Sequence, residues 1–142
     1  MITENRKKHI WAVAEFLKNF ATEQNMKSED CEALYTLGML HDIGYEFLEE
    51  KDYSTHNIVG GNLLKNLGYK YWKEVYYHGL PNSPYQSYFL DLLNWADART
   101  DGTGNTVSFE EGLLDISRRY NIPVEKLEYL KLVEELKDKG FK

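Results

Sequence analysis

Hydrophobic residues recur at steps of three and four along almost the whole chain, which is the spacing of amphipathic helices. In the first such stretch, Val13, Phe16 and Leu17 share one helical face. Thr3 precedes this stretch and is a residue type that commonly caps a helix. We therefore expect a first helix from Thr3 to about Glu23.

The second and third helices are marked by polar starts and by glycine ends. Ser28 begins the second helix, because two acidic residues follow it where the positive end of the helix dipole favours them. We expect this helix to stop near Gly44, acting as a left-handed cap. The polar loop 52–55 then leads into a third helix, which runs through Leu67 and ends at Gly68.

The middle of the chain predicts two more helices, separated by a loop that is rich in proline and glycine. Residues 69–78 form the fourth helix, and the loop follows at 79–84. The fifth helix covers about 84–99 and carries an apolar run.

Two helices are expected after the turn-rich stretch 101–106. Ser108 and Glu111 form a capping box for the sixth helix, which continues through Tyr120. Pro123 suits the first position of a seventh helix that ends at Gly140. This last helix has an amphipathic stripe, and we find little chemistry on it.

The sequence therefore predicts an all-α fold, a single compact domain of about six to seven helices over residues 1–142. Its composition of 42% hydrophobic and 14% aromatic residues is sufficient for one substantial core. No apolar run reaches the roughly 18 residues of a membrane helix, and the N-terminus lacks a signal-peptide pattern. We therefore expect a cytoplasmic protein with no membrane partner.

Charge and cysteine content remove other classes of function. The chain has 17 basic and 23 acidic residues, a formal charge of −6, which argues against broad nucleic-acid binding. Cys31 is the only cysteine, so an internal disulfide and a thiolate zinc site are both excluded.

The four histidines of the chain fall on, or at the edge of, four different predicted helices. They are His9, His41, His56 and His78, and each shares a helical face with apolar residues. A single histidine in such a place is more often an ordinary hydrogen-bonded core residue. Four of them in one small core can satisfy their polar atoms by sharing a metal.

Two carboxylates strengthen this interpretation. Asp42 directly follows His41 at the end of an apolar helix, where an unpaired buried charge would be costly. Asp97 lies after an apolar run and between two alanines. For Asp97 a buried ion pair with Arg99 or another basic residue is an equally good explanation.

The order of these residues resembles the HD superfamily of metal-dependent phosphohydrolases. The similarity lies in RKKHIWAVAEFL, LGMLHDIGY, STHNIVGGNLL, VYYHG and NWADART. It covers residues 6 to about 101, and about 107–140 would be a C-terminal helical extension. The pattern is similar to small bacterial HD hydrolases that act on dinucleoside polyphosphates.

The resemblance implies a binding site for one or two divalent transition metals and a small phosphorylated substrate. Imidazole and carboxylate ligands suit Fe, Mn, Co, Ni or Zn. The Asp of the HD pair would bridge two metals and be the catalytic carboxylate. The implied metal ligands are His9, His41, Asp42, His56, His78 and Asp97.

Basic residues near this pattern are candidates for binding the substrate phosphate. Arg6 precedes His9 by one helical turn and is the first candidate, Arg99 is the second and Lys8 is a weaker third. Many relatives have a lysine three residues after the Asp of the pair, where this chain has Tyr45.

Three functions remain open at this point. The first is a phosphohydrolase of a small phosphate ester or nucleotide. The second is a di-iron HD-type oxygenase with the same order of ligands, and the third is a non-enzymatic metal-binding helical module. Aromatic residues such as Trp72, Tyr76 and Tyr88 could serve a homodimer surface as readily as a core.

Overall fold

The computed structural model describes residues 1–142 and contains seven α-helices and no β-strand, which confirms the predicted all-α fold. None of the helices combines the length and the apolar character needed to cross a membrane. The α-helices are α1 (Glu4–Glu23), α2 (Ser28–Leu40), α3 (His56–Asn66), α4 (Trp72–Tyr77), α5 (Tyr88–Ala98), α6 (Phe109–Tyr120) and α7 (Glu128–Asp138). Three short 3-10 helices are η1 (Ile43–Glu46), η2 (Glu50–Asp52) and η3 (Val124–Lys126).

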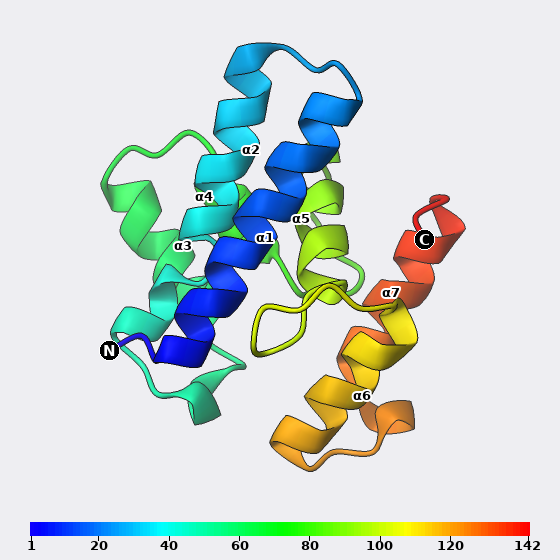
Figure 1. Cartoon of the computed structure of the whole chain (residues 1–142). Helices are drawn as coiled ribbons and strands as arrows, with labels where there is room; N and C mark the ends of the chain where they lie inside the picture. The colour runs from blue at the N-terminus through cyan, green and yellow to red at the C-terminus, as the bar shows by residue number, and fades with distance from the viewer.

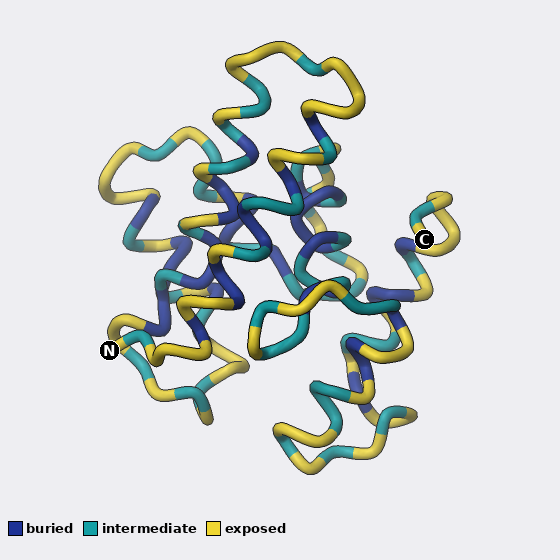
Figure 2. Tube along the Cα trace, viewed as in Figure 1, coloured by how far each residue is buried: buried dark blue, intermediate teal, exposed yellow.

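Helices α1 and α2 form an antiparallel hairpin, and α5 packs against both of them (Figure 1). Helices α3 and α4 pack together on one side, while α6 and α7 lie on the other side (Figure 1). The buried segments gather where α1, α2 and α5 meet (Figure 2). Leu17, Leu34, Leu37, Leu92 and Leu93 are completely buried there and form the centre of the main core.

The backbones of α1 and α2 approach each other closely because α2 has a glycine at the contact. A Cβ atom on Gly38 would lie 2.5 Å from the Cα atom of Ala14. The rings of His9 and His41 lie near each other across the two helices, tilted by 50° and with centroids 5.6 Å apart.

The second helix ends earlier than predicted, and Gly44 lies in the next element. Helix α2 stops at Leu40, and Ser28 is its first residue, after the N-cap Lys27, which makes no side-chain cap. Gly44 belongs to η1, and a Cβ atom on it would lie 2.0 Å from the carbonyl oxygen of His56. The glycine therefore permits contact with the start of α3, and the expected left-handed cap at Gly44 is wrong.

Other boundaries follow from local caps. Helix α5 begins at Tyr88 because the Ser87 side chain accepts a hydrogen bond from the backbone of Leu90, so the expected start near residue 84 is wrong. Helix α4 covers only Trp72–Tyr77, and η3 precedes α7 where one continuous helix from Pro123 was expected. The capping box of α6 and the Thr3 cap of α1 are confirmed.

A second, smaller core joins the end of α5 to α6 and α7. Its buried apolar side chains include Phe109, Leu113, Leu127, Leu132, Val133 and Leu136. The two C-terminal helices are thereby held against the end of α5, which carries Asp97.

Candidate metal centre

The six residues predicted as metal ligands come together from five segments of the chain. Their positions are near helix ends in most cases, where the backbone leaves one element and side chains can converge. His9 lies in α1, His41 is the C-cap of α2, Asp42 is the N-cap of η1, His56 begins α3, His78 is the C-cap of α4 and Asp97 lies in the last turn of α5.

Four of these residues form a first group, His9, His41, Asp42 and Asp97, whose candidate ligand atoms all lie within 4.8 Å of one another. Asp97 Oδ1 lies 2.8 Å from His9 Nε2 and 3.4 Å from His41 Nε2. Asp42 Oδ2 lies 3.3 Å from His41 Nε2 and 3.6 Å from His9 Nε2. Two imidazoles and two carboxylates thus face a common point.

The second group consists of Asp42, His56 and His78. Asp42 Oδ1 lies 3.2 Å from His56 Nε2 and 3.4 Å from His78 Nε2, and the two imidazole nitrogens are 3.2 Å apart. Asp42 therefore offers one oxygen to each group.

Hydrogen bonds to the backbone orient all four imidazoles in the same way. Each Nδ1 atom lies 2.5 to 2.9 Å from a carbonyl oxygen, that of Asp101 for His9 and that of the residue three positions earlier for the other three histidines. A carbonyl oxygen only accepts, so each Nδ1 carries the proton. In the neutral rings every Nε2 then directs a lone pair into the site, as in protein metal ligands.

The resulting set of atoms fits a cation. Lone pairs of four imidazoles and two carboxylates face one another, and the buried Nε2 atom of His41 makes no hydrogen bond. Such an arrangement of acceptors is costly in a buried site unless a positive charge lies among them. The absence of thiolates favours a metal that accepts nitrogen and oxygen ligands.

The electrostatics of the metal-free chain agree with this conclusion. Burial lowers the pKa of His41, but the adjacent carboxylates of Asp42 and Asp97 outweigh burial and raise its pKa to about 10. Burial alone would raise the pKa of the Asp42 and Asp97 carboxyl groups. The nearby histidines, together with Arg6 at Asp42, outweigh burial and hold each pKa well below its usual range. Without a metal, a proton on His41 supplies part of the missing positive charge.

Arg6 donates a hydrogen bond to the oxygen of Asp42 that faces the first group. Its Nη1 atom donates to Asp42 Oδ2 at 2.9 Å, while Nη2 and Nε donate to the two carboxylate oxygens of Glu50 at 2.7 and 3.2 Å. The guanidinium also lies 4.2 Å from the ring centre of Tyr45, which stacks on His56. Arg6 is buried, and all of these partners are internal, so its clearest role is to orient Asp42.

A cavity of about 410 Å³ opens onto this centre. Arg6 and five of the six candidate ligands line its base, and only the fully buried His41 does not. Residues from the two C-terminal helices and the loops before them form much of the wall. The wall residues include Tyr53, Leu80, Ile116, Arg119, Tyr120 and Ile122.

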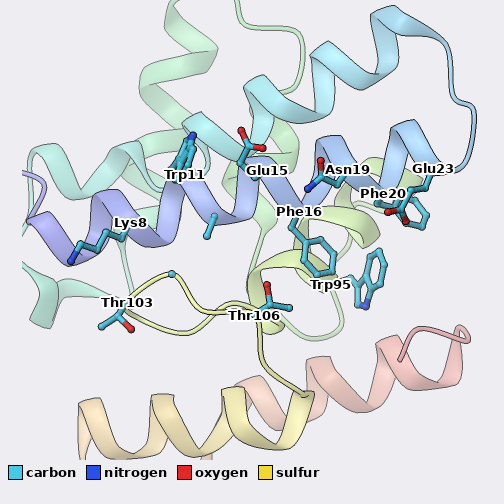
Figure 3. Close-up of a pocket in the computed structure, with 12 residues that line it drawn as sticks. Lys8, Trp11, Glu15, Phe16, Asn19, Phe20, Glu23, Trp95, Thr103 and Thr106 are labelled. Atoms are coloured by element: carbon cyan, nitrogen blue, oxygen red, sulfur yellow. The ribbon is translucent and has the colours of Figure 1, made fainter.

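The structure does not bring Arg99 or Lys8 to this cavity. The Arg99 guanidinium donates to the carbonyl oxygens of Val107 and Lys142, on another face of the molecule. Lys8 instead lies at the edge of a separate pocket, which is lined by α1 residues such as Trp11 and by the loop that holds Thr103 (Figure 3). The basic residues that do line the cavity, besides Arg6, are Arg119 of α6 and Lys126 of η3.

Tyr129 is the site residue that the sequence analysis missed. Its hydroxyl donates to Asp97 Oδ2 at 3.1 Å, and burial followed by the Asp97 charge raises the pKa of the phenol well above its usual value. The residue belongs to α7, where we expected little chemistry. Its position shares a face with Leu132, Val133 and Leu136, so the helical spacing could have placed it toward the interior.

The all-helical fold thus gathers histidine and aspartate side chains from several helices into groups that are positioned to hold a metal ion. The sequence model of the HD domain family matches residues 6–119, well over half of the chain, and the chain belongs to this family. HD domains are typically metal-dependent phosphohydrolases. The match extends beyond the motif residues 6–101 into α6. Comparisons with curated proteins and with solved structures gave no match.

Proposed function

We propose that this chain is a metal-dependent phosphohydrolase acting on a small phosphate ester or nucleotide. The observation that supports this most directly is the position of Asp42, whose Oδ2 faces the first group and whose Oδ1 faces the second. A carboxylate shared in this way is suited to two metals held side by side, an arrangement found in many phosphatases.

In this proposal His9, His41, Asp42 and Asp97 hold one divalent metal, and His56 and His78 hold a second together with Asp42. A metal bound there supplies Lewis-acid polarisation of a phosphoryl oxygen and a water molecule with a lowered pKa. Asp42, as the one carboxylate common to both groups, is the residue on which catalysis depends most.

The chain itself contributes orientation and shielding. The backbone carbonyl bonds fix each imidazole with Nε2 directed inward, and Arg6 and Glu50 fix Asp42. Tyr45 occupies the position of the lysine found in many relatives, and its ring is buried between the Arg6 guanidinium and His56. The basic residues that line the cavity and can supply a cation near the reacting phosphate are Arg6, Arg119 and Lys126.

The cavity supports a small substrate that is anionic at one end. Its base carries candidate ligands, while Leu80, Ile116 and Ile122 provide an apolar wall. Tyr53 and Tyr120 also line the cavity, and their ring centroids lie 4.1 Å apart. A volume of about 410 Å³ lies within the usual range for small-molecule sites. These features suit a phosphate group attached to an apolar or aromatic moiety.

The experiment is a phosphatase panel under nitrogen with added Mn²⁺ or Fe²⁺. The panel contains aryl phosphates, nucleoside monophosphates, sugar phosphates and a dinucleoside tetraphosphate. We expect metal-dependent phosphate or nucleotide release by the wild-type chain and none by the identically purified Asp97→Asn variant.

Equal release by both proteins would assign the activity to a contaminant and contradict the proposal. If turnover occurred only when the same panel was repeated in air, with consumption of dissolved oxygen, the oxygenase reaction would be favoured instead. Metal binding without turnover on any substrate would favour a non-enzymatic metal-binding role.

A further inference from the structure

Tyr129 lies ten residues beyond the part of the chain that matches the HD family. It is the second residue of α7, and the apolar side chains of Leu132, Val133 and Leu136 anchor the same face of that helix in the smaller core. A Cβ atom on Gly79, the residue after His78, would lie 3.8 Å from Cε2 of the tyrosine ring. The phenol is therefore held between the segments that carry Asp97 and His78.

Because of the hydrogen bond from Tyr129, the two oxygens of the Asp97 carboxylate have different partners. Oδ1 faces His9 Nε2 at 2.8 Å, and Oδ2 receives its only hydrogen bond from the Tyr129 hydroxyl at 3.1 Å. The terminal torsion of an aspartate is soft, so its carboxylate rotates easily when nothing holds it. With the phenol in place, rotation would break the hydrogen bond and leave a buried anionic oxygen without a donor.

We propose that Tyr129 is a positioning residue of the metal centre, which holds Asp97 so that Oδ1 alone is presented to the metal of the first group. The C-terminal helix is thereby a functional part of the site and not only a covering extension. This inference rests on the proposed metal-binding role of Asp97, but it does not depend on the reaction catalysed. Groups that orient a metal ligand in this way typically contribute about 10- to 100-fold to metal affinity.

The test compares Tyr129→Phe with Tyr85→Phe in the full-length chain. Both substitutions remove one hydroxyl and keep the ring. Tyr85 is a matched control because its hydroxyl donates to the buried carboxylate of Glu74 at 2.8 Å, away from the candidate ligands. Cobalt(II) is the probe, since its affinity is measured by competition with a chelator and its visible absorption reports coordination geometry.

We expect Tyr129→Phe to bind Co²⁺ about 10- to 100-fold more weakly than the wild type and to change the Co²⁺ absorption spectrum. Tyr85→Phe should keep the wild-type affinity and spectrum. The melting temperatures of the two metal-free variants should be similar, because each loses one phenol–carboxylate hydrogen bond. A purely structural Tyr129 would not alter the spectrum of the bound ion.

Wild-type affinity and spectrum in Tyr129→Phe would overturn the positioning role and leave the proposed function intact. An equal loss of affinity in both variants would also overturn it, because the effect would then be a general loss of stability. If the wild-type chain bound no Co²⁺, the positioning role and the metal-dependent function would both be wrong. Loss of affinity in Tyr129→Phe alone, in a chain inactive on every phosphate ester, would support the positioning role and reject the phosphohydrolase.

Discussion

The two groups of candidate ligands share Asp42 but differ in charge and in access. The first group combines two carboxylates with His9 and His41, and Arg6 and Tyr129 donate to those carboxylates from behind. The second group has only one oxygen of Asp42 and the imidazoles of His56 and His78. The His56 side chain is 16% exposed, whereas that of His41 is completely buried.

We therefore expect the two groups to differ in their affinity for metal and in their accessibility to a substrate. Two buried carboxylates offset the charge of a divalent ion, so we expect the first group to bind metal more tightly. The only negative charge in the second group is that of Asp42, which it shares with the first group. We therefore expect the second group to bind metal more weakly. Because His56 is partly exposed, the second position is also the easier one for a substrate to reach.

The largest effect should come from Asp42→Asn, which removes the charge that both groups share. We expect loss of both metal equivalents and of hydrolysis. Removing the buried charge opposite Arg6 should also destabilise the metal-free chain, by on the order of 3–5 kcal/mol. Metal analysis and urea denaturation with a chelator measure the two effects. Retention of one tightly bound metal would show that the groups do not depend on a common carboxylate.

A smaller and unequal effect should distinguish His9→Ala from His56→Ala. The first variant should lose the tightly bound metal and most of the activity, while the second should keep close to one metal equivalent per chain. Metal that binds the native state raises the melting temperature of the wild type. Because His9→Ala should not bind the tightly held metal, added metal should not raise its melting temperature to the same extent. Equal metal contents in the two variants would contradict the proposed order of affinities.

The smallest effect should come from Arg99→Ala. This side chain donates to backbone carbonyls of Val107 and Lys142 and does not line the cavity. We expect unchanged metal content and unchanged turnover, with a stability loss of about 1 kcal/mol for the missing hydrogen bonds. A large rise in KM for a phosphate ester would show that Arg99 reaches the substrate after all and would restore our original expectation.

Some features could be predicted because they depend on neighbours along the chain. The three- and four-residue spacing of apolar residues determined the helices, and the caps at Thr3 and Ser108 marked two of their starts. The same spacing predicted that the histidines face inward. Gly44 was wrongly predicted as the cap of α2, because this glycine instead meets the His56 backbone, a contact between segments that local rules do not contain.

The sequence by itself therefore determined the helical class, the types of the candidate ligands and their order along the chain. The resemblance already implied that Asp42 is shared, but only the tertiary structure decided that Arg6 turns toward Asp42 and that Arg99 turns away. It also brought Tyr129 to Asp97 across 32 residues of sequence. The physical reason is that periodicity selects the face of a helix, whereas the close approach of backbones, as at Gly38 and Ala14, decides which faces meet.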